Sequence, residues 1–148
     1  MSDASSDVAG RLAIVTGRIN RRIRAAAGGL SYGSLSALAT VQKFGPIRLA
    51  DLAAQEFISA PSTTRLIAEL ERRGLVSRTV DPDDGRAFLI ESTPAGDLEV
   101  VRARQARAEL VGEMLADLSP SDWETVNAAL EVIQRSVERD EVPPPPRR

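Results

Sequence analysis

Apolar residues recur every three or four positions near the start of the chain, and this spacing indicates one face of a helix. They are Val8, Leu12, Val15, Ile19 and Ile23. Gly28-Gly29 is a helix-ending signal, because glycine readily adopts the left-handed conformation that closes many helices. The pattern predicts a helix over residues 8–29, whereas residues 1–7 are polar and acidic and are expected to be disordered.

Two further apolar stripes lie in the last third of the chain, over residues 93–140. Thr93-Pro94 and Ser119-Pro120 each place a capping hydroxyl before a proline, which the first turn of a helix tolerates. The apolar positions of the final helix have coiled-coil-like spacing. They are Trp123, Val126, Leu130, Ile133 and Val137. Residues 141–148 are rich in proline and are expected to be disordered.

A small lobe is predicted between these helices, over residues 30–92. Its middle contains a short helix over Leu49–Glu56, a turn filled by Phe57 and Ile58, and a second helix with Ser59 as its N-cap. Helical spacing places three apolar residues of the second helix on the inner face. They are Leu66, Ile67 and Leu70, with Thr63, Thr64 and Glu71 expected to face outward.

The lobe is predicted to end in a β-hairpin. Leu75–Val80 and Ala87–Ser92 have the composition of strands, and the acidic segment Asp81–Gly85 has the composition of a turn. The fold class is therefore mainly α with a small β-hairpin.

The three flanking helices each carry an apolar stripe, and one small lobe cannot cover all of them. The simplest solution is a homodimer in which these helices pack against a second copy of the chain. Antiparallel packing within a monomer is the alternative. The expected interface residues are Leu12, Ile19, Leu118, Trp123, Val126, Leu130, Ile133 and Val137.

Composition excludes several classes of function. The 148 residues contain no cysteine and no histidine, so thiolate metal sites, redox thiols and Ser-His or Cys-His catalysis are not expected. No enzyme activity, metal or cofactor is therefore predicted. No apolar run approaches the roughly 18–20 residues needed to span a bilayer, and the polar N-terminus is not a signal peptide. We therefore expect a cytoplasmic protein without membrane partners.

The net charge of −2 argues against a nucleic-acid-binding protein, but the distribution of charge matters more than its sum. Five arginines and no acid lie between Arg11 and Arg24, and Lys43 is the only lysine. Arginine is well suited to forked contacts with phosphates and guanines. A GC-rich coding sequence that favours arginine is an equally open explanation.

The start of the second lobe helix combines small hydroxyl side chains with one arginine. The segment runs Ser59-Ala60-Pro61-Ser62-Thr63-Thr64-Arg65. Such a helix start can enter a DNA groove, where hydroxyls and arginine reach base edges and phosphates. Helix capping is the alternative explanation for the hydroxyls, because Ser and Thr are common at helix starts.

Several ordered motifs resemble the MarR (multiple antibiotic resistance regulator) family of winged helix-turn-helix proteins. They are Leu52-Ala53, Ala60–Ile67, Leu70–Val76, Asp81–Arg86 and Ser92–Gly96. The resemblance covers residues 8–138 and implies a DNA-binding lobe over residues 30–92 between dimerisation helices.

The resemblance implies a homodimeric transcriptional regulator, usually a repressor, on double-stranded DNA. Half-sites about 10 bp apart are expected in a near-palindromic operator. The DNA-binding residues assigned on this basis are Ser59, Pro61, Ser62, Thr63, Thr64, Arg65, Arg72, Arg78 and Arg86. The alternative is a winged-helix protein-interaction module without specific DNA binding.

The hairpin becomes a DNA-contacting wing in this interpretation. Arg86 is expected to enter the minor groove, while Asp81 or Asp84 orients an arginine or caps the turn. A solvated acidic turn is the alternative for the whole tip. Ion pairs with Glu69 or Glu71 are the alternative for Arg72 and Arg78.

The resemblance also implies control by a small aromatic or anionic effector. Its cleft is expected between residues 11–24, 30–42 and 98–115. An anionic molecule there could pair with Arg11, Arg18 or Arg22. A solvated or dimer-bridging salt link is the other role open to these arginines.

Overall fold

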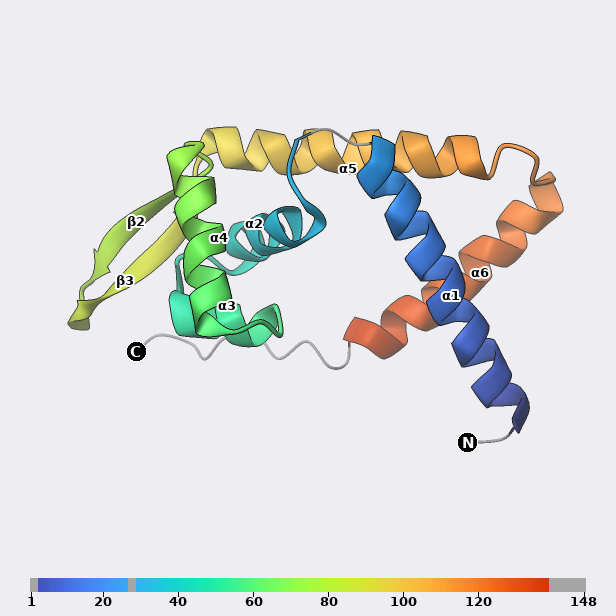
Figure 1. Ribbon diagram of the computed structural model, residues 1–148, viewed down its shortest axis with the longest axis horizontal. Helices are drawn as coiled ribbons and strands as arrows, with labels where there is room; N and C mark the ends of the chain where they lie inside the picture. The colour runs from blue at the N-terminus through green and yellow to red at the C-terminus, as the bar shows by residue number, and fades with distance from the viewer. Residues whose placement is uncertain (1–2, 27–28, 139–148) are drawn as a thin grey trace.

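The computed structural model describes residues 3–26 and 29–138, and it contains six helices and three strands within those ranges. In chain order they are α1 (Asp3–Ala26), α2 (Tyr32–Phe44), β1 (Ile47–Arg48), α3 (Leu49–Gln55), α4 (Ala60–Arg72), β2 (Val76–Asp81), β3 (Asp84–Ser92), α5 (Pro94–Met114) and α6 (Pro120–Glu138). Figure 1 shows α2–α4 and the hairpin gathered at one end of α5, with α1 and α6 beside its other half. The predicted class, mainly helical with a small β-wing, is confirmed.

The helix starts follow local capping signals. Ser31 Oγ accepts a hydrogen bond from Ser34 N at 3.1 Å before α2, and Thr93 Oγ1 accepts one from Gly96 N at 3.1 Å before α5. At α6, Ser119 Oγ accepts from Asp122 N at 3.2 Å, and Asp122 Oδ2 accepts from Ser119 N at 3.0 Å. Ser119 Oγ also donates to Asp122 Oδ2 at 2.6 Å, and the hydrogen bonds from the Ser119 side chain and backbone lower the pKa of Asp122, because they stabilise its carboxylate.

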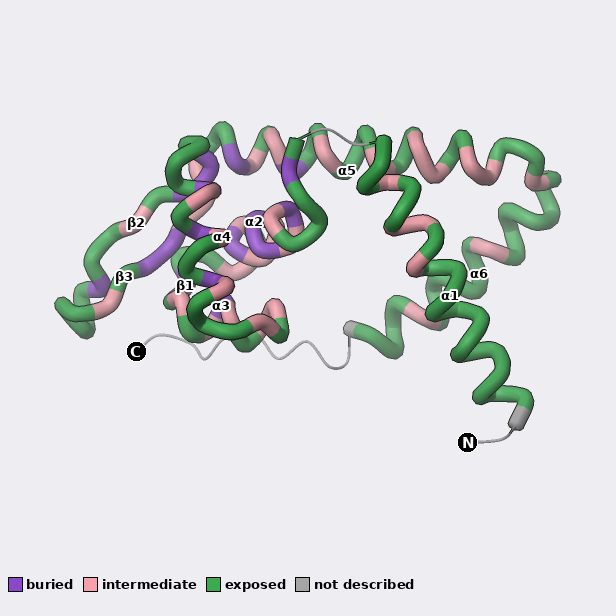
Figure 2. Tube along the Cα trace, in the orientation of Figure 1, coloured by how far each residue is buried: buried purple, intermediate pink, exposed green. Residues whose placement is uncertain are grey.

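A single apolar core holds the lobe together. Leu38, Leu52 and Ile67 come from three different helices and are completely buried, and Val100 extends the core onto α5. Figure 2 shows buried positions concentrated in the lobe and around the start of α5. The lobe therefore has a core of its own, to which the first turns of α5 belong.

The strands form one antiparallel sheet in the order β1-β3-β2. Ile47 of β1 pairs with Ile90 of β3, and both side chains are buried. Val80 and Phe88 pair across β2 and β3 nearer the tip and remain exposed. The base of the hairpin is thus part of the core, whereas its outer half projects from the lobe.

The apolar stripes of α1 and α6 remain largely uncovered in the single chain. Leu12, Trp123 and Leu130 are 44%, 42% and 49% exposed, and Val137 is 62% exposed. Ile19, Leu118, Val126 and Ile133 are half-buried. Figure 2 shows α1 and α6 as mostly exposed.

Two expectations about local structure differ from the structure. Residues 3–7 belong to α1, since no glycine or proline interrupts them and their acids suit a helix N-terminus. Phe57 does not fill the turn: it has a φ of 53° and is 88% exposed, while Ile58 is half-buried. The expected disorder of residues 1–2 and 141–148, and Gly28 of the predicted helix end, lie outside the described residues.

Hydrogen bonds join the residues just after α4 to the start of α5, although the wing separates the two helices in sequence. Gly74 has a φ of 71° and allows Leu75 N to donate to Leu70 O at 2.9 Å, as in a Schellman closure. Thr93 then donates twice to this exit, from Oγ1 to Gly74 O at 2.7 Å and from N to Leu75 O at 3.1 Å. Gly96 is buried so tightly that a Cβ there would overlap the Leu75 carbonyl.

Gly96→Ala is expected to lower the free energy of unfolding by about 2–3 kcal/mol, because the added methyl meets backbone that cannot rotate away. Gly112→Ala is the matched control, since it lies on the same helix with open space around it. The control should be neutral or stabilising by up to about 1 kcal/mol. Denaturant unfolding of both variants measures the difference, and equal stabilities would contradict the close junction.

Candidate nucleic-acid interface

The first turn of α4 presents a polar edge to solvent. Ser59 occupies the N-cap position without a side-chain cap hydrogen bond; its Oγ donates instead to Ser62 Oγ at 3.0 Å. Pro61, Thr64 and Arg65 are exposed, and Ser62 is half-buried. Simple capping therefore does not account for the Ser59 hydroxyl, which remains at the surface.

Thr63 is the exception in this segment, and its expected outward orientation is wrong. The side chain is completely buried, and its Oγ1 donates to Ser59 O at 3.0 Å. Thr63 precedes Ile67 by four residues and Leu70 by seven, so all three share the inner helical face. Thr63 therefore stabilises the lobe and is removed from the candidate DNA contacts, and the same spacing could have revealed this from the sequence.

Acidic residues of the lobe form ion pairs with three of its six arginines, among them Arg72 and Arg78. Arg72 Nη2 lies 2.7 Å from Glu69 Oε1, and this hydrogen-bonded pairing raises the pKa of Arg72. Arg78 Nε lies 2.9 Å from Glu71 Oε2, close enough for an ion pair but not aligned for a hydrogen bond. Both arginines thus adopt the ion-paired alternative, which leaves them less available to phosphates.

Three other arginines of the lobe form no ion pair within the described chain. They are Arg65 near the start of α4, Arg73 at its end and Arg86 at the wing tip, and all three are exposed. Figure 1 shows β2 leaving the end of α4 and running back along it, so the wing tip lies toward the end of the lobe where α4 begins. Arg65 in the second turn of α4 and Arg86 beside the wing tip therefore lie toward this end, and Arg73, the C-cap of α4, lies at the other.

Two aspartates of the wing tip have structural roles. Asp81 is buried: its Oδ2 accepts from Arg48 Nε at 2.6 Å and its Oδ1 from Asp83 N at 2.9 Å. Asp84 Oδ1 accepts from Arg86 N at 3.0 Å and so shapes the backbone beside that arginine. The expectation that Asp81 or Asp84 orients an arginine or caps the turn describes both residues.

Arg48 was not among the residues assigned to the site. Its hydrogen bond to Asp81 spans 33 residues of sequence and raises the pKa of Arg48. No local spacing links the two residues, and only their pairing across β1 and the wing brings them together. The absence of a Ser or Thr cap before α3 was the one available signal, because Arg48 occupies that position.

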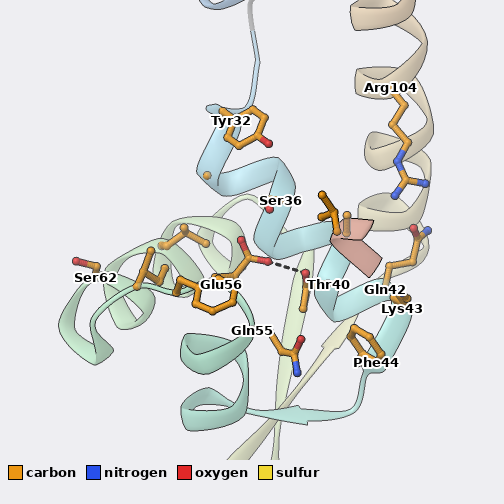
Figure 3. A pocket seen from close by; sticks show the side chains of 16 residues that line it. Tyr32, Ser36, Thr40, Gln42, Lys43, Phe44, Gln55, Glu56, Ser62 and Arg104 are labelled. Carbon is orange, nitrogen blue, oxygen red and sulfur yellow. Dashed lines mark hydrogen bonds between the residues drawn. The ribbon is translucent and has the colours of Figure 1, made fainter. Parts of the chain in front are cut away.

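A hollow lies between α2, the α3–α4 turn, α4, α5 and the end of α6. It has a volume of about 990 Å³, and its lining includes Tyr32, Phe44, Glu56 and Arg104. Figure 3 shows the Thr40 hydroxyl meeting Glu56 across it, and the hydrogen bond to Glu56 Oε1 is 2.6 Å long. The cavity therefore joins α2 and α5 to the start of α4.

The arginines predicted for an effector site do not line this cavity. Arg11, Arg18 and Arg22 lie on α1, which contacts α5 away from the lobe, and they are exposed. Arg11 lies 3.9 Å from Asp7 on the same helix. The expected wall from residues 11–24 is therefore absent in the single chain, and Lys43 and Arg104 supply the cationic lining instead.

The described ranges contain neither a candidate metal-binding group of side chains nor a candidate membrane-spanning helix. Residues 3–26 and 29–138 contain no group of three or more His, Cys, Asp or Glu side chains that could hold a metal ion. No helix in the same ranges has the length and apolar content needed to cross a bilayer.

The fold and these surfaces define the class. A short helix, a turn, a longer helix with an exposed polar start and an antiparallel wing form a winged helix-turn-helix.

Comparison with known proteins identifies the family. The model of the MarR family matches residues 30–88. Over 135 residues the chain is 34% identical to an uncharacterized HTH-type transcriptional regulator of Mycobacterium bovis, an alignment covering 90% of this chain and 94% of that protein. The chain belongs to the MarR family and is a DNA-binding transcriptional regulator, not an enzyme.

Solved structures share the fold. A transcriptional regulator protein of Pseudomonas aeruginosa superposes with a TM-score of 0.76 at 26% identity, covering 93% of this chain and 98% of that one. FabT of Streptococcus pneumoniae, solved in complex with DNA, superposes with a TM-score of 0.65 at 13% identity, covering 93% and 99% of the two chains.

Substitution of adjacent threonines tests the orientation of α4. Thr63→Ala should lower the free energy of unfolding by about 1–2 kcal/mol, because it removes a buried hydrogen bond and leaves a small void. Thr64→Ala removes the same groups from an exposed site and should change stability by less than about 0.5 kcal/mol. Urea unfolding of both variants measures this, and equal losses would contradict the burial of Thr63.

Proposed function

We propose that this regulator is a repressor that binds a near-palindromic operator as a homodimer and is modulated by a small-molecule effector. The observation that carries the DNA-binding assignment is which arginines of the lobe are ion-paired and which are not. Arg48, Arg72 and Arg78 are ion-paired, whereas Arg65 and Arg86 are exposed, form no ion pair within the described residues and lie toward the same end of the lobe. Free guanidinium groups at that end can contact bases and phosphates at little cost in lost ion pairs.

Arg65 is the proposed reader of the major groove. It follows the exposed first turn of α4, and a bidentate contact to guanine contributes about 1–3 kcal/mol of discrimination. Ser62 and Thr64 supply hydroxyls beside it, with Ser59 and Pro61 at the edge of the same surface. Arg86, on the wing, is proposed to enter the adjacent minor groove, where negative potential attracts arginine.

The homodimer is supported by the exposed apolar stripes of α1 and α6. Burying these stripes against a second copy removes apolar surface from water. A two-fold dimer presents two α4 helices, so its operator consists of two related half-sites about 10 bp apart. Repression then follows if the operator overlaps a promoter, because bound protein blocks access of the polymerase.

Selection of bound sites from a random DNA pool, repeated with single variants, tests this assignment. Arg65→Ala should lose the preference for one base at one symmetric pair of positions and weaken binding by about 1–3 kcal/mol per half-site. Arg86→Ala should weaken binding and reduce the salt dependence by about one phosphate equivalent per protomer. Arg73→Ala removes an equally free arginine from the opposite end and should leave affinity within about twofold, since salt screens distant charges.

The selection also separates the two candidate functions. Selected sites without two related half-sites would argue against the dimer on its operator. A folded protein that shows no sequence preference at low salt would instead favour a winged-helix protein-interaction module, which the net charge of −2 also suits.

The effector is proposed to occupy the 990 Å³ cavity beside α4, and an aromatic acid fits its lining of aromatic and cationic side chains. Salicylate is a suitable probe and should raise the unfolding temperature while lowering DNA affinity. Arg104→Ala should abolish both effects, because Arg104 lines the cavity. Arg102→Ala, two residues away and outside the lining, is the control. If salicylate and related acids leave both quantities unchanged, the anionic effector is wrong.

A further inference from the structure

A smaller cavity lies under the wing and has no role in the assignments above. Its volume is about 350 Å³, and it opens between β1, the start of α3 and the inner side of β3. Leu49, Phe88 and Ile90 provide apolar lining, Arg48, Arg78 and Arg86 provide guanidinium groups, and Asp84 provides one carboxylate. This combination matches neither a purely apolar core defect nor a solvated polar surface.

The side chain of Arg48 is held with one edge of its guanidinium engaged. Nε donates to Asp81 Oδ2 at 2.6 Å, and this is the only hydrogen bond of the group within the described chain. Asp81 is 2% exposed and its other oxygen accepts from Asp83 N, so the carboxylate is fixed. The Arg48 side chain is 45% exposed. Its two Nη groups form no hydrogen bond within the described residues, although the Asp84 and Asp51 carboxylates also act on this guanidinium, and they can donate to an anion with oxygen acceptors.

Phe88 adds an apolar surface beside these donors. Its side chain is 53% exposed, whereas the next two residues of β3, Leu89 and Ile90, are buried. An exposed aromatic ring next to a free guanidinium edge fits a ligand that is apolar on one side and anionic on the other. The deoxyribose-phosphate backbone of DNA has this composition.

We propose that this cavity holds one sugar–phosphate unit of the bound DNA, with the Arg48 Nη groups donating to the phosphate and Phe88 packing on the deoxyribose. The inference rests on the proposed DNA-binding face, because Arg86 belongs both to that face and to the lining of the cavity. A strand bordering the minor groove that receives Arg86 passes the mouth of the same cavity. Arg48 thus contributes affinity without sequence preference, as phosphate contacts do.

Backbone neutralisation provides the test. In the selected operator, each phosphate is replaced in turn by an uncharged methylphosphonate, and affinities are measured for the wild-type protein and for Arg48→Gln. Glutamine keeps one amide donor for Asp81 while the cation and its forked donors are lost; because the buried Asp81 carboxylate then lacks its cation, an unfolding curve of the variant checks that it remains folded. The variant should bind operator and random duplex about tenfold more weakly per half-site, in line with the loss of a charge-assisted hydrogen bond.

We expect one phosphate per half-site whose replacement affects the wild-type protein but not Arg48→Gln. Replacement there should weaken wild-type binding but leave binding by Arg48→Gln unchanged. Phe88→Ala should weaken binding to both duplexes at least about threefold, because the sugar loses its apolar contact. Arg73→Ala should retain the wild-type pattern.

Each contrary result has a distinct meaning. Wild-type binding that is sequence-specific, together with an Arg48→Gln variant that is sensitive to the same positions, would overturn the sugar–phosphate site and leave the operator assignment intact. Wild-type affinity in Phe88→Ala would overturn the packing on deoxyribose. Absence of any sequence-specific binding by the folded wild-type protein would remove the proposed function itself.

Discussion

The junction between the end of α4 and the start of α5 is the constraint on which the DNA-binding geometry depends. Thr93 donates to both Gly74 O and Leu75 O, and Gly96 lies against the same carbonyl. These hydrogen bonds fix the orientation of α4 relative to α5, although the wing lies between the two helices in sequence. In a dimer built on the flanking helices, the spacing of two recognition helices would therefore follow from backbone hydrogen bonds rather than from the wing.

Selective neutralisation explains how a negatively charged chain can present a DNA-binding face. Between residues 44 and 92 there are six arginines and eight acids, so long-range attraction to DNA is weak. Local acids pair with Arg72, Arg78 and the Nε edge of Arg48, whereas Arg65 and Arg86 form no ion pair within the described residues. Unpaired positive charge therefore remains where the proposed contacts read a base or fix the position of the protein on DNA. Such a protein gives up non-specific affinity, which depends on the number of phosphate contacts.

Local signals predicted most of the fold, whereas the Arg48–Asp81 contact is non-local and the error at Thr63 came from neglect of helical spacing. The starts at Thr93 and Ser119 depend on hydrogen bonds three residues away, so the sequence reveals them. The Arg48–Asp81 pair depends on sheet pairing and leaves no comparable pattern. Thr63 was assigned by its chemistry as a hydroxyl at a helix start, although its spacing to Ile67 and Leu70 indicated burial. For that residue helical phase was the better guide, because position on the helix decides exposure before side-chain type does.

The large cavity gives the proposed regulation a direct route to α4. Ser62 and Leu66 of α4 line it together with Glu56 and Ile58, which frame the turn before that helix. Glu56 is tied to Thr40 of α2, so any molecule that competes for either group acts on the link between α2 and the turn. Phe57 holds a left-handed φ in this turn, a conformation that a bulky side chain adopts only at a cost in energy. In the proposed regulation, occupancy of the cavity shifts this strained turn and with it the start of α4. Because coupling between two binding sites is reciprocal, DNA that fixes α4 must alter the affinity of the cavity by the same factor.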